Sequence, residues 1–403
     1  ATVSDTVAQK SDANIYKVVD PAPKQLPSDE AINRAVELLN NAKHPVLLLG
    51  KGAAYAQAED EIRELVAKTN IPFLPMSMAK GVVPDDSPAS AASARSFTLG
   101  QADVVLLVGA RLNWMLSNGG SPLFSPDAKF IQVDIDATEF DSNRKIDAPL
   151  QGDIKSVMQK FNSAVIDAGV KAPQDWLDQI KTESEKNNTK FAKRISASEA
   201  KPTLGFYSAI EPINDLLQKH PDTYIVSEGA NTLDIGRNLI SMQKPRHRLD
   251  TGTWGVMGVG MGYAIATAVE TGKPVIALEG DSAFGFDGME METICRYHLP
   301  VIVVVVNNGG IYNGDVNVVP DQPGPTVLDH DAHYGDIAKA FGGDSYRVNN
   351  YTEMKDALEK AYESGNPTII DAQIPASMGK ESGHIGNLNP KLDLSSLEEK
   401  ENK

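Results

Sequence analysis

The chain has 403 residues, enough for two or three domains, and its 41% hydrophobic and 23% charged content is typical of a globular protein. Its net charge of −16 disfavours a nucleic-acid or anionic-membrane partner, although a local basic pocket for a phosphorylated ligand stays compatible with it. The one cysteine, Cys295, excludes an internal disulfide framework, and no apolar run has transmembrane length. We therefore predict a cytoplasmic protein.

The chain is predicted to start with a connector. Its first residues, "ATVSDTVAQKSD", lack an initiator Met, which suggests a cut or processed N-terminus, and residues 1–27 include the Pro-rich "DPAPKQLP". Ser28, followed by Asp29 and Glu30, is predicted to cap a helix that extends to about Asn41. The first folded domain is therefore expected to begin at residue 28.

Residues 28–165 are predicted to form a doubly wound α/β domain. Helical patterns lie at 58–69 and 152–161, and buried strands are expected at "PVLLLG", "IPFLP", "DVVLLVGA" and "KFIQVDID". Strands that alternate with helices predict a parallel sheet covered on both faces. Residues 166–202 are polar and charged, and we interpret them as a connector with helical stretches; a solvated helix pair without a site is the simplest explanation of this composition.

A second α/β series is predicted over residues 203–374. Its expected strands are 223–229, 274–280, 300–308 and 367–374, separated by helices at 205–218, 258–271, 286–297, 331–341 and 352–363. The predicted fold class is thus α/β with two doubly wound parallel-sheet domains. The tail, residues 375–403, carries Gly and Ser and ends in charges, so we expect it to be mobile.

Polar, Gly-containing turns follow two successive strands of the second domain. The turns are Gly280-Asp281-Ser282 and Asn307-Asn308-Gly309-Gly310. In open parallel sheets ligands bind at the carboxyl ends of strands, and the helices that follow direct their N-termini toward the same place, which favours an anion. The Asp281 carboxylate, the Asn308 amide oxygen and the Gly310 carbonyl are hard oxygen ligands that suit Mg²⁺. The sequence therefore predicts a metal–diphosphate site; the alternative is a chance pair of turns in a flavodoxin-like sheet.

These turns resemble the fingerprint of thiamine diphosphate-dependent enzymes, with Ser282 in place of a third glycine. "SEGAN" (227–231) and the Gly-rich "DTGTWGVMGVGMGYAIA" (250–266) extend the resemblance. It implies that Met257 is an apolar wedge beneath the cofactor and that the Gly255 carbonyl accepts a hydrogen bond from the aminopyrimidine; the alternative is a Gly-rich turn with Met257 in the core. The further implied cofactor contacts are Ala230, Asn231, Gly280, Ser282, Ala283, Ile311 and Tyr312, although Tyr312 is equally explained by plain packing.

The segment "GDSAFGFDGMEMETICRY" resembles the branch of this family that acts on acyl-CoA substrates, the oxalyl-CoA decarboxylases and 2-hydroxyacyl-CoA lyases. "NNGGIYNGD" and "ESGHIGNLNP" favour the decarboxylases, and the resemblance covers about residues 15–392. It implies conversion of oxalyl-CoA to formyl-CoA and CO₂ with thiamine diphosphate and Mg²⁺. The residues 28–165 would then be a central Rossmann-like domain that binds ADP as an activator.

The resemblance also assigns nucleotide and substrate contacts. Those to ADP would come from Lys51, Arg111, Asp134 and Ile154, and those to the coenzyme A ester from Arg237, Asn238 and Ser382. Ser382 lies in the tail, which in this family folds over the active site as a lid. Ordinary surface roles are nearly as good an explanation for Lys51 and Arg111, a helix-surface salt bridge is as good for Arg237, and the basic "KPRHR" (244–248) is interpreted as structural.

The family has a further domain before the central one, and a glutamate of that domain hydrogen-bonds the pyrimidine ring across a dimer interface. No carboxylate of this chain lies in a matching sequence context. We therefore expect the chain to need a pyrimidine-binding domain, from the same or another chain, to be inactive without it, and to form a homo-oligomer when complete. The alternatives are a 2-hydroxyacyl-CoA lyase and a non-catalytic protein that binds nucleotide or thiamine diphosphate.

Overall fold

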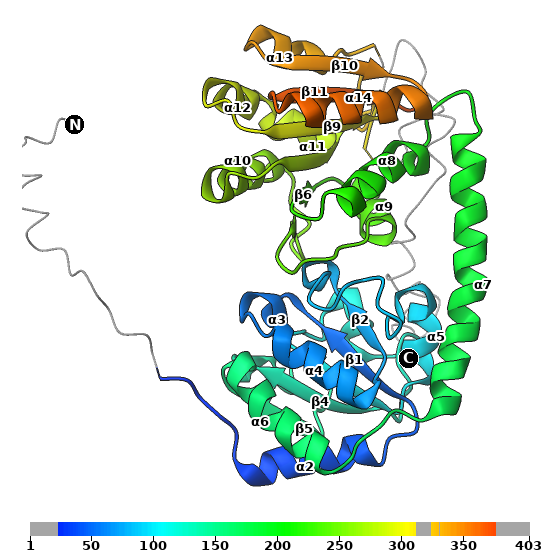
Figure 1. Cartoon of the computed structure of the whole chain (residues 1–403), viewed down its shortest axis with the longest axis vertical. Coiled ribbons are helices and arrows are strands. Elements are labelled where there is room, and N and C mark those ends of the chain that lie inside the picture. The colour runs from blue at the N-terminus through cyan, green and yellow to red at the C-terminus, as the bar shows by residue number, and fades with distance from the viewer. Residues whose placement is uncertain (1–22, 312–323, 330, 376–403) are drawn as a thin grey trace, which may run out of the picture.

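The computed structural model describes residues 23–311, 324–329 and 331–375. It contains two α/β units, one above the other along the longest axis of the molecule (Figure 1). Within this part of the chain every pairing between named strands is parallel, and helices cover the sheets. The predicted fold class, two parallel-sheet α/β domains, is confirmed.

The first unit is built on a five-stranded sheet in the order β2-β1-β3-β4-β5. Its strands are β1 (Pro45–Leu49), β2 (Phe73–Pro75), β3 (Val104–Val108), β4 (Lys129–Asp134) and β5 (Ala148–Gln151). Its helices are α2 (Asp29–Asn40), α3 (Lys51–Tyr55), α4 (Glu59–Thr69), α5 (Arg95–Gln101) and α6 (Ile154–Asp167). The edge strand β5 was not predicted, because "APLQ" is short and contains a proline, which only an edge strand tolerates well.

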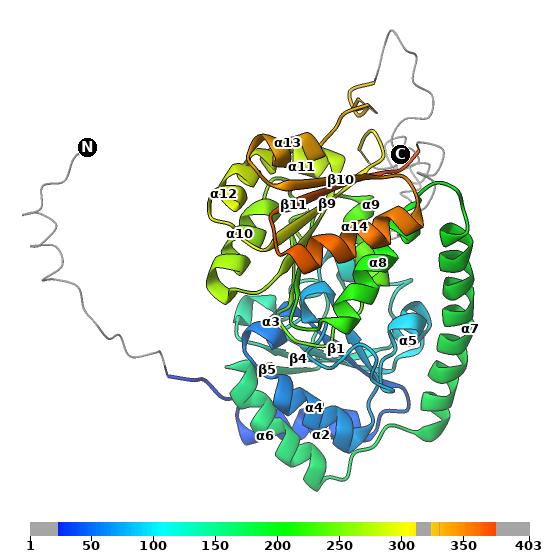
Figure 2. The same cartoon turned by 45° about the horizontal axis from the view of Figure 1, so that its top comes forward.

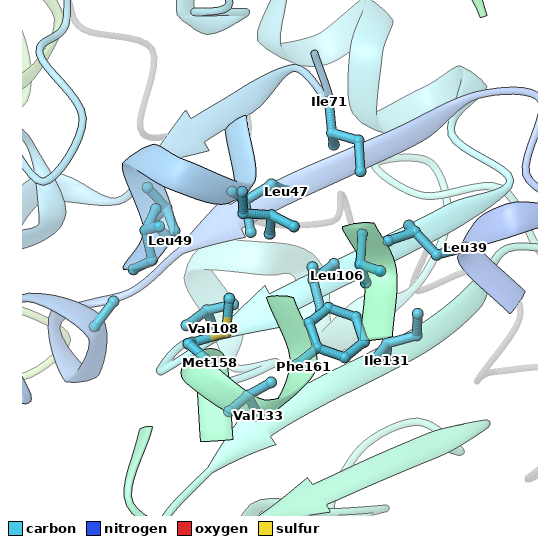
Figure 3. Packing of buried hydrophobic residues seen from close by; sticks show 14 of the residues in the cluster. Leu39, Leu47, Leu49, Ile71, Leu106, Val108, Ile131, Val133, Met158 and Phe161 are labelled. Atoms are coloured by element: carbon cyan, nitrogen blue, oxygen red, sulfur yellow. The ribbon is translucent and has the colours of Figure 1, made fainter. Parts of the chain in front are cut away.

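The core of this unit forms because apolar side chains of the central strands meet one face of α6. Figure 3 shows Leu106, Val108 and Ile131 of the sheet beside Met158 and Phe161 of the helix, all fully buried. The predicted cap of α2 is confirmed, since the Ser28 hydroxyl accepts a hydrogen bond from the Ala31 N–H at 3.3 Å. Local sequence signals and core packing thus agree in this unit.

The second unit is built on a six-stranded sheet in the order β10-β11-β9-β8-β6-β7. Its strands are β6 (Tyr224–Ser227), β7 (Arg248–Asp250), β8 (Val275–Gly280), β9 (Val301–Asn307), β10 (Asp344–Val348) and β11 (Thr368–Gln373). Its helices are α8 (Phe206–Lys219), α9 (Asn231–Leu239), α10 (Gly260–Thr271), α11 (Asp281–Asp287), α12 (Met291–Arg296), α13 (Gly335–Ala340) and α14 (Tyr351–Ser364).

Two details of this unit differ from the expectation. The edge strands β7 and β10 were missed, because "RLD" and "DSYRV" contain charged residues and lack an apolar run. In place of the helix expected at 286–297, the structure has the end of α11, a 3₁₀ turn at Gly288–Glu290 and the short helix α12. A Cβ on Gly288 would lie 2.8 Å from the Phe284 ring, so this close turn requires glycine.

The connector contains one long helix, α7 (Gln174–Glu199, 26 residues), rather than a helix pair. It runs beside both units in both views (Figures 1 and 2). At its start the fully buried Trp176 indole donates to the Pro45 carbonyl at 3.0 Å, and near its end the Phe191 ring meets Tyr207 of α8 edge-on at 5.8 Å. The helix is therefore anchored to both units. Among the described residues, none of the helices combines the length and apolar character needed to cross a membrane.

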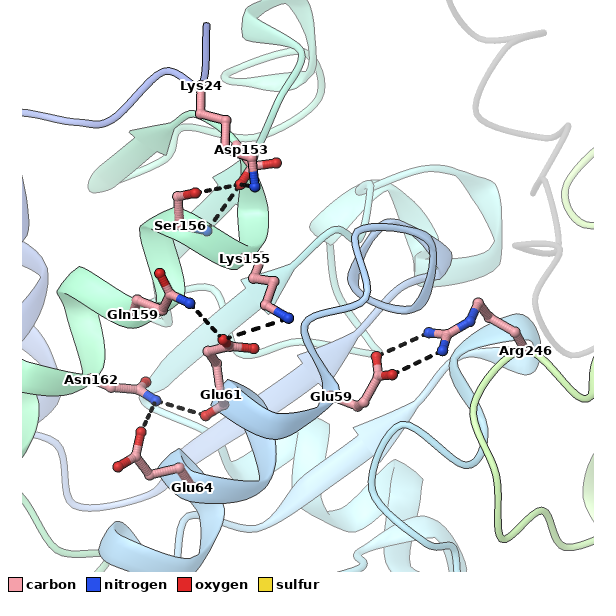
Figure 4. Close-up of polar contacts among 10 residues, drawn as sticks. All are labelled: Lys24, Glu59, Glu61, Glu64, Asp153, Lys155, Ser156, Gln159, Asn162 and Arg246. Carbon is pink, nitrogen blue, oxygen red and sulfur yellow. Dashed lines mark hydrogen bonds and ion pairs between the residues drawn. The ribbon is translucent and has the colours of Figure 1, made fainter. Parts of the chain in front are cut away.

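The predicted structural role of "KPRHR" agrees with the contacts of its arginines. The Arg246 guanidinium donates to both carboxylate oxygens of Glu59 on α4, at 2.8 and 2.9 Å (Figure 4). It also donates to the Ala54 carbonyl at 2.8 Å. Arg248, fully buried, donates to the Ser77 hydroxyl at 3.1 Å. Both arginines of this segment thus bind groups of the first unit. The bidentate Arg246–Glu59 pair holds its partners in a defined geometry.

The buried carboxyl of Glu211 on α8 provides a test of the packing of the second unit. Burial raises the pKa of its carboxyl from 4.5 to about 7, and the negative charge of Asp215 adds to the shift. Because the folded carboxyl keeps its proton to higher pH than the unfolded one, stability is lost as the pH rises from about 4.5 through about 7. We expect Glu211→Gln to raise the free energy of unfolding by about 1–2 kcal/mol at pH 8, a value discounted for partial exposure, and by less than about 0.5 kcal/mol at pH 5.

Urea unfolding at the two pH values measures this difference. The exposed Glu363→Gln on α14 is the control, for which we expect no pH-dependent gain. An equal effect of Glu211→Gln at pH 5 and pH 8 would contradict the expectation.

Candidate functional site

The carboxyl ends of β6, β8 and β9 lie side by side, because these parallel strands are neighbours in the second sheet. Glycines form the turns that follow. A Cβ on Gly229, after β6, would lie 3.3 Å from the backbone nitrogen of Gly280, at the end of β8, so the two turns are in contact. Gly229 and Gly309 have φ values of +105° and +73°, a region that favours glycine. The three turns therefore form one continuous surface of backbone.

Asp281, the first residue of α11, ties the turns after β8 and β9 together. Its side chain is 1% exposed, and its Oδ2 accepts the N–H groups of Asn308 at 3.1 Å and Gly310 at 3.0 Å, while Oδ1 accepts the N–H of Ser282 at 2.6 Å. Burial raises the pKa of the Asp281 carboxyl, and hydrogen bonds from Gly310 and Ser282 act against the shift. The three predicted metal ligands, Asp281, Asn308 and Gly310, are thus brought to one point.

The two adjacent asparagines have different surroundings. The Asn307 side chain is buried within the sheet and donates to the Asp371 carboxylate of β11 at 3.2 Å. Asn308 follows β9 and lies in the turn whose N–H groups contact Asp281. The structure therefore gives Asn307 a packing role and leaves Asn308 as the asparagine positioned at the strand end, as the sequence predicted.

Asp281, Asn308 and Gly310 carry oxygen groups of the kinds that Mg²⁺ binds. A carboxylate, an amide oxygen and a backbone carbonyl are all hard ligands. Within residues 23–311, 324–329 and 331–375, no three His, Cys, Asp or Glu side chains gather into a group able to hold a metal ion. A site with a single carboxylate matches the way Mg²⁺ is usually held, by one or two carboxylates together with phosphate oxygens of a ligand. The kinds of ligand at these strand ends are therefore compatible with a metal that arrives with a diphosphate.

Tyr334, just before α13, faces this point but was not singled out from the sequence. Burial raises the pKa of its phenol to about 12, and the negative charge of Asp281 adds to the shift. Its ring lies edge-on to Phe284 of α11 at 5.8 Å. The position far along the chain and the absence of a motif around Tyr334 left no sequence signal for this contact.

A buried glutamate, which the sequence analysis also missed, holds the Gly-rich segment. Glu228 follows β6 and is fully buried; one carboxylate oxygen accepts the N–H of Gly258, and the other accepts the N–H groups of Val259, at 3.0 Å, and Gly260. Burial raises the pKa of Glu228, and its hydrogen bonds to Gly258 and Val259 counteract the shift. The available signal was a glutamate within "SEGAN" at the end of a buried strand.

Two further carboxyl groups lie near Glu228. Glu279, the residue before the last one of strand β8, is fully buried, and its pKa is raised well above the ordinary value by burial and by the charge of Glu228. Asp287, the last residue of α11, accepts the N–H of Met261 at 3.1 Å. Glu228 and Asp287 thus accept backbone N–H groups at the start of α10, where the N-terminus of a helix favours negative charge.

The predicted cofactor residues occupy these turns. Gly255 has a φ of +60°, and Met257 is half-buried rather than part of the core. Asn231 begins α9 and is buried, with Ala230 just before it. Gly280, Ser282 and Ala283 surround the start of α11, and the N–H of Ile311 donates to the Thr326 carbonyl at 2.9 Å. Tyr312 and Ser382 lie outside the described residues.

The predicted substrate residues of α9 bind groups of their own unit. The Arg237 Nε lies 3.3 Å from the Asp250 carboxylate, and its Nη2 donates to the Gly252 carbonyl at 3.4 Å. The Asn238 side chain donates to the Asp234 carbonyl at 3.0 Å. Arg237 thus forms a salt bridge, but the pair is largely buried between α9 and β7 rather than on a helix surface, as the alternative explanation had it.

The predicted ADP residues lie at the carboxyl ends of the first sheet. Lys51 begins α3 directly after β1, Asp134 ends β4, and Ile154 begins α6. A Cβ on Gly52 would lie 3.2 Å from the Ile154 Cδ1, so the turn after β1 contacts α6. Burial raises the pKa of Asp134. These three residues thus lie after β1, at the end of β4 and after β5, at the same edge of one sheet.

Arg111, the fourth predicted ADP residue, faces the second unit. Its guanidinium lies 3.4 Å from the Glu139 carboxylate and 3.4 Å from the Thr253 hydroxyl. Trp114 donates to the Thr253 carbonyl at 3.3 Å. The loop after β3 therefore contacts the Gly-rich segment of the second unit.

The fold and the strand-end site together define a class of protein. The family model "Thiamine pyrophosphate enzyme, central domain" matches residues 32–161, and the model "Thiamine pyrophosphate enzyme, C-terminal TPP binding domain" matches residues 229–372. The chain belongs to the thiamine pyrophosphate enzyme family.

Relatives within the family narrow this assignment. The chain is 48% identical over 395 residues to oxalyl-CoA decarboxylase of Escherichia coli (strain K12), an alignment that covers 97% of the chain and 70% of that protein. It is 43% identical over 379 residues to 2-hydroxyacyl-CoA lyase of Oryza sativa subsp. japonica, an alignment that covers 91% of the chain and 65% of that protein. It is 41% identical over 374 residues to 2-hydroxyacyl-CoA lyase 1 of Homo sapiens, an alignment that covers 87% of the chain and 63% of that protein. The chain is thus a homologue of both kinds of enzyme.

Gly260 tests the packing of the two glutamates against α10. A Cβ at this position would collide with the Glu279 carboxyl and would lie 2.7 Å from the Glu228 carboxylate. We expect Gly260→Ala to destabilise the fold by about 1–3 kcal/mol, the usual cost of overpacking. Thermal or urea unfolding measures this effect.

Gly262→Ala, in the same helix, is the matched control. A Cβ there meets nothing within 4 Å, so we expect this variant to stabilise the helix by up to about 1 kcal/mol. Equal effects of the two substitutions would show that the glutamates do not crowd Gly260.

Proposed function

We propose that this protein is a decarboxylase that converts oxalyl-CoA to formyl-CoA and CO₂ with thiamine diphosphate and Mg²⁺. The observation that carries the proposal is the meeting of Asp281, Asn308 and Gly310 at neighbouring strand ends. The 48% identity to an oxalyl-CoA decarboxylase over 97% of the chain supports the substrate. In the bound state, thiamine diphosphate supplies an electron sink for the loss of CO₂.

The residues of this chain bind and orient the cofactor. Asp281, Asn308 and Gly310 would hold Mg²⁺ and, through it, the diphosphate. The turn that contains Ala230 and Asn231 offers backbone N–H groups beside the diphosphate, where Gly229 contacts Gly280. Gly255 and Met257 would hold the pyrimidine ring. Because Asp281 is buried and its pKa is raised, a bound cation would stabilise the ionised carboxylate.

We further propose that ADP binds at the carboxyl end of the first sheet and acts as an activator. Asp134 at the end of β4 is suited to ribose hydroxyls, Lys51 to phosphate and Ile154 to the adenine ring. The close approach of adjacent turns supports this proposal, because a Cβ on Gly50 would collide with the Gly109 carbonyl. Arg111 is the weaker member of the set, since it already pairs with Glu139.

Two aspartates, one in each unit, act as reciprocal controls in a calorimetric test. We expect Asp281→Ala to weaken binding of thiamine diphosphate with Mg²⁺ by about 100-fold or more and to leave ADP binding unchanged, since even outer-shell changes cost metal sites about 10–100-fold. We expect Asp134→Ala to weaken only ADP binding. Omission of Mg²⁺ should weaken thiamine diphosphate binding to the wild-type protein in the same way as Asp281→Ala.

Unchanged thiamine diphosphate binding by Asp281→Ala would contradict the site. The exposed Asp222→Asn, in the turn before β6 at the opposite end of the strands, should bind both ligands normally.

The substrate separates the leading function from its closest alternative. A 2-hydroxyacyl-CoA lyase is the second candidate, because lyases of this kind are 43% and 41% identical to the chain. We expect kcat/KM for oxalyl-CoA to exceed that for a long-chain 2-hydroxyacyl-CoA by at least about tenfold, a difference of about 1.4 kcal/mol in transition-state binding.

The assay uses protein loaded with thiamine diphosphate and Mg²⁺ and supplied with the pyrimidine-binding domain expected from the sequence. The opposite preference would assign the lyase function. Cofactor binding without turnover of either substrate would favour the non-catalytic alternative.

A further inference from the structure

We propose that Glu228 is a positioning residue of the cofactor site, whose carboxylate fixes the backbone of residues 258–260 and so sets the place of Gly255 and Met257. This inference rests on the proposed function, because it assumes that the pyrimidine ring lies against the Gly-rich segment. It assigns a role to a buried carboxylate for which the proposed function has no other use.

Glu228 connects the two halves of the proposed cofactor site. It follows β6 directly and precedes Gly229, whose turn contacts Gly280 beside the diphosphate-binding turns. Its carboxylate accepts the N–H groups of Gly258, Val259 and Gly260, the three residues that directly follow Met257. One side chain thus holds the Gly-rich segment at a defined place relative to the strand ends of the sheet.

A local helix cap would not produce this connection. Most helices are capped by a side chain at the residue before the first turn, but at that position α10 has Val259, whose side chain makes no cap hydrogen bond. The acceptor is instead Glu228, directly after β6 and about thirty residues earlier in the chain. The start of α10 is therefore located by the sheet, and the residues just before it, Gly255 and Met257, are located with it.

The Glu228 side chain acts here only as a hydrogen-bond acceptor, and it accepts three consecutive N–H groups. Glu279 and Asp287 face the same helix start, and both are acidic. Within the described part of the chain, the hydrogen bonds of the Glu228 side chain come from the N–H groups of residues 258–260. Glu228→Gln preserves the size of the side chain, but it removes the charge and turns an NH₂ donor toward N–H groups.

The test compares two diphosphates that differ in whether they carry a pyrimidine ring. Calorimetry with Mg²⁺ measures the affinity for thiamine diphosphate and for inorganic pyrophosphate. We expect Glu228→Gln to weaken thiamine diphosphate binding by at least about tenfold and to change pyrophosphate binding by less than about twofold, because the lost contacts to a charged acceptor lie on the pyrimidine side. Asp281→Ala should weaken binding of both.

Hydrogen exchange of the wild-type and Glu228→Gln chains provides a readout that does not need the ligand. We expect faster amide exchange confined to the peptide that covers residues 254–262. Asp287→Asn is the matched control, because Asp287 accepts the N–H of Met261 in the same helix, whereas the N–H groups of residues 258–260 donate to Glu228. It should change neither the exchange of Gly258 and Val259 nor the ratio of the two affinities. Glu228→Asp, which retains the charge on a shorter side chain, should give an intermediate ratio, and it replaces Glu228→Gln if that variant does not fold.

The outcomes separate this inference from the proposed function. Failure of the wild-type protein to bind thiamine diphosphate with Mg²⁺ would overturn the proposed function and the positioning role with it. Normal wild-type binding, together with an unchanged affinity ratio and unchanged exchange in Glu228→Gln, would overturn the positioning role alone. An equal loss of affinity for both diphosphates would show a general structural effect and would also overturn it.

Discussion

The hydrogen bonds between the Asp281 carboxylate and the N–H groups of Asn308 and Gly310 are the contact on which the proposed site depends. They exist because β8 and β9 are parallel neighbours whose ends are in register, with Gly280 opposite Val306. A parallel pair places both of its carboxyl ends at one edge of the sheet, so the turns that follow must meet there. The same constraint places the turn after β6, with Glu228 and Gly229, beside them.

Backbone N–H groups, rather than cationic side chains, donate to the Asp281, Glu228 and Asp287 carboxylates at this edge. Asp281 accepts from the turn after β9, Glu228 from the start of α10, and Asp287 from Met261. N–H donors stabilise a carboxylate without neutralising it, which leaves Asp281 able to bind a cation. The arginines nearby have other partners, since Arg237 and Arg248 both lie at Asp250. This division keeps positive side chains away from the place where Mg²⁺ would bind.

Contacts between the two units connect the proposed ADP site of the first unit to the proposed cofactor site of the second. The long helix α7 holds the units together because it packs against one unit near each of its ends. The bidentate ion pair between Arg246 and Glu59 adds a second connection. Arg111 and Trp114, in the loop after β3, contact Thr253 of the Gly-rich segment. The carboxyl end of the first sheet is thereby in direct contact with the segment proposed to hold the pyrimidine ring.

The sequence by itself determined the fold class, most of the strands and the strand-end turns, because apolar runs, glycines and a polar residue after a strand are local signals. It led to Asp281 and Asn308 for the same reason. Only the tertiary structure decided that Asn307 pairs with Asp371, that Arg237 pairs with Asp250, and that Glu228 and Tyr334 belong beside the site. These roles depend on which strands become neighbours, and that choice follows from the packing of whole sheets and helices rather than from residues adjacent in the chain.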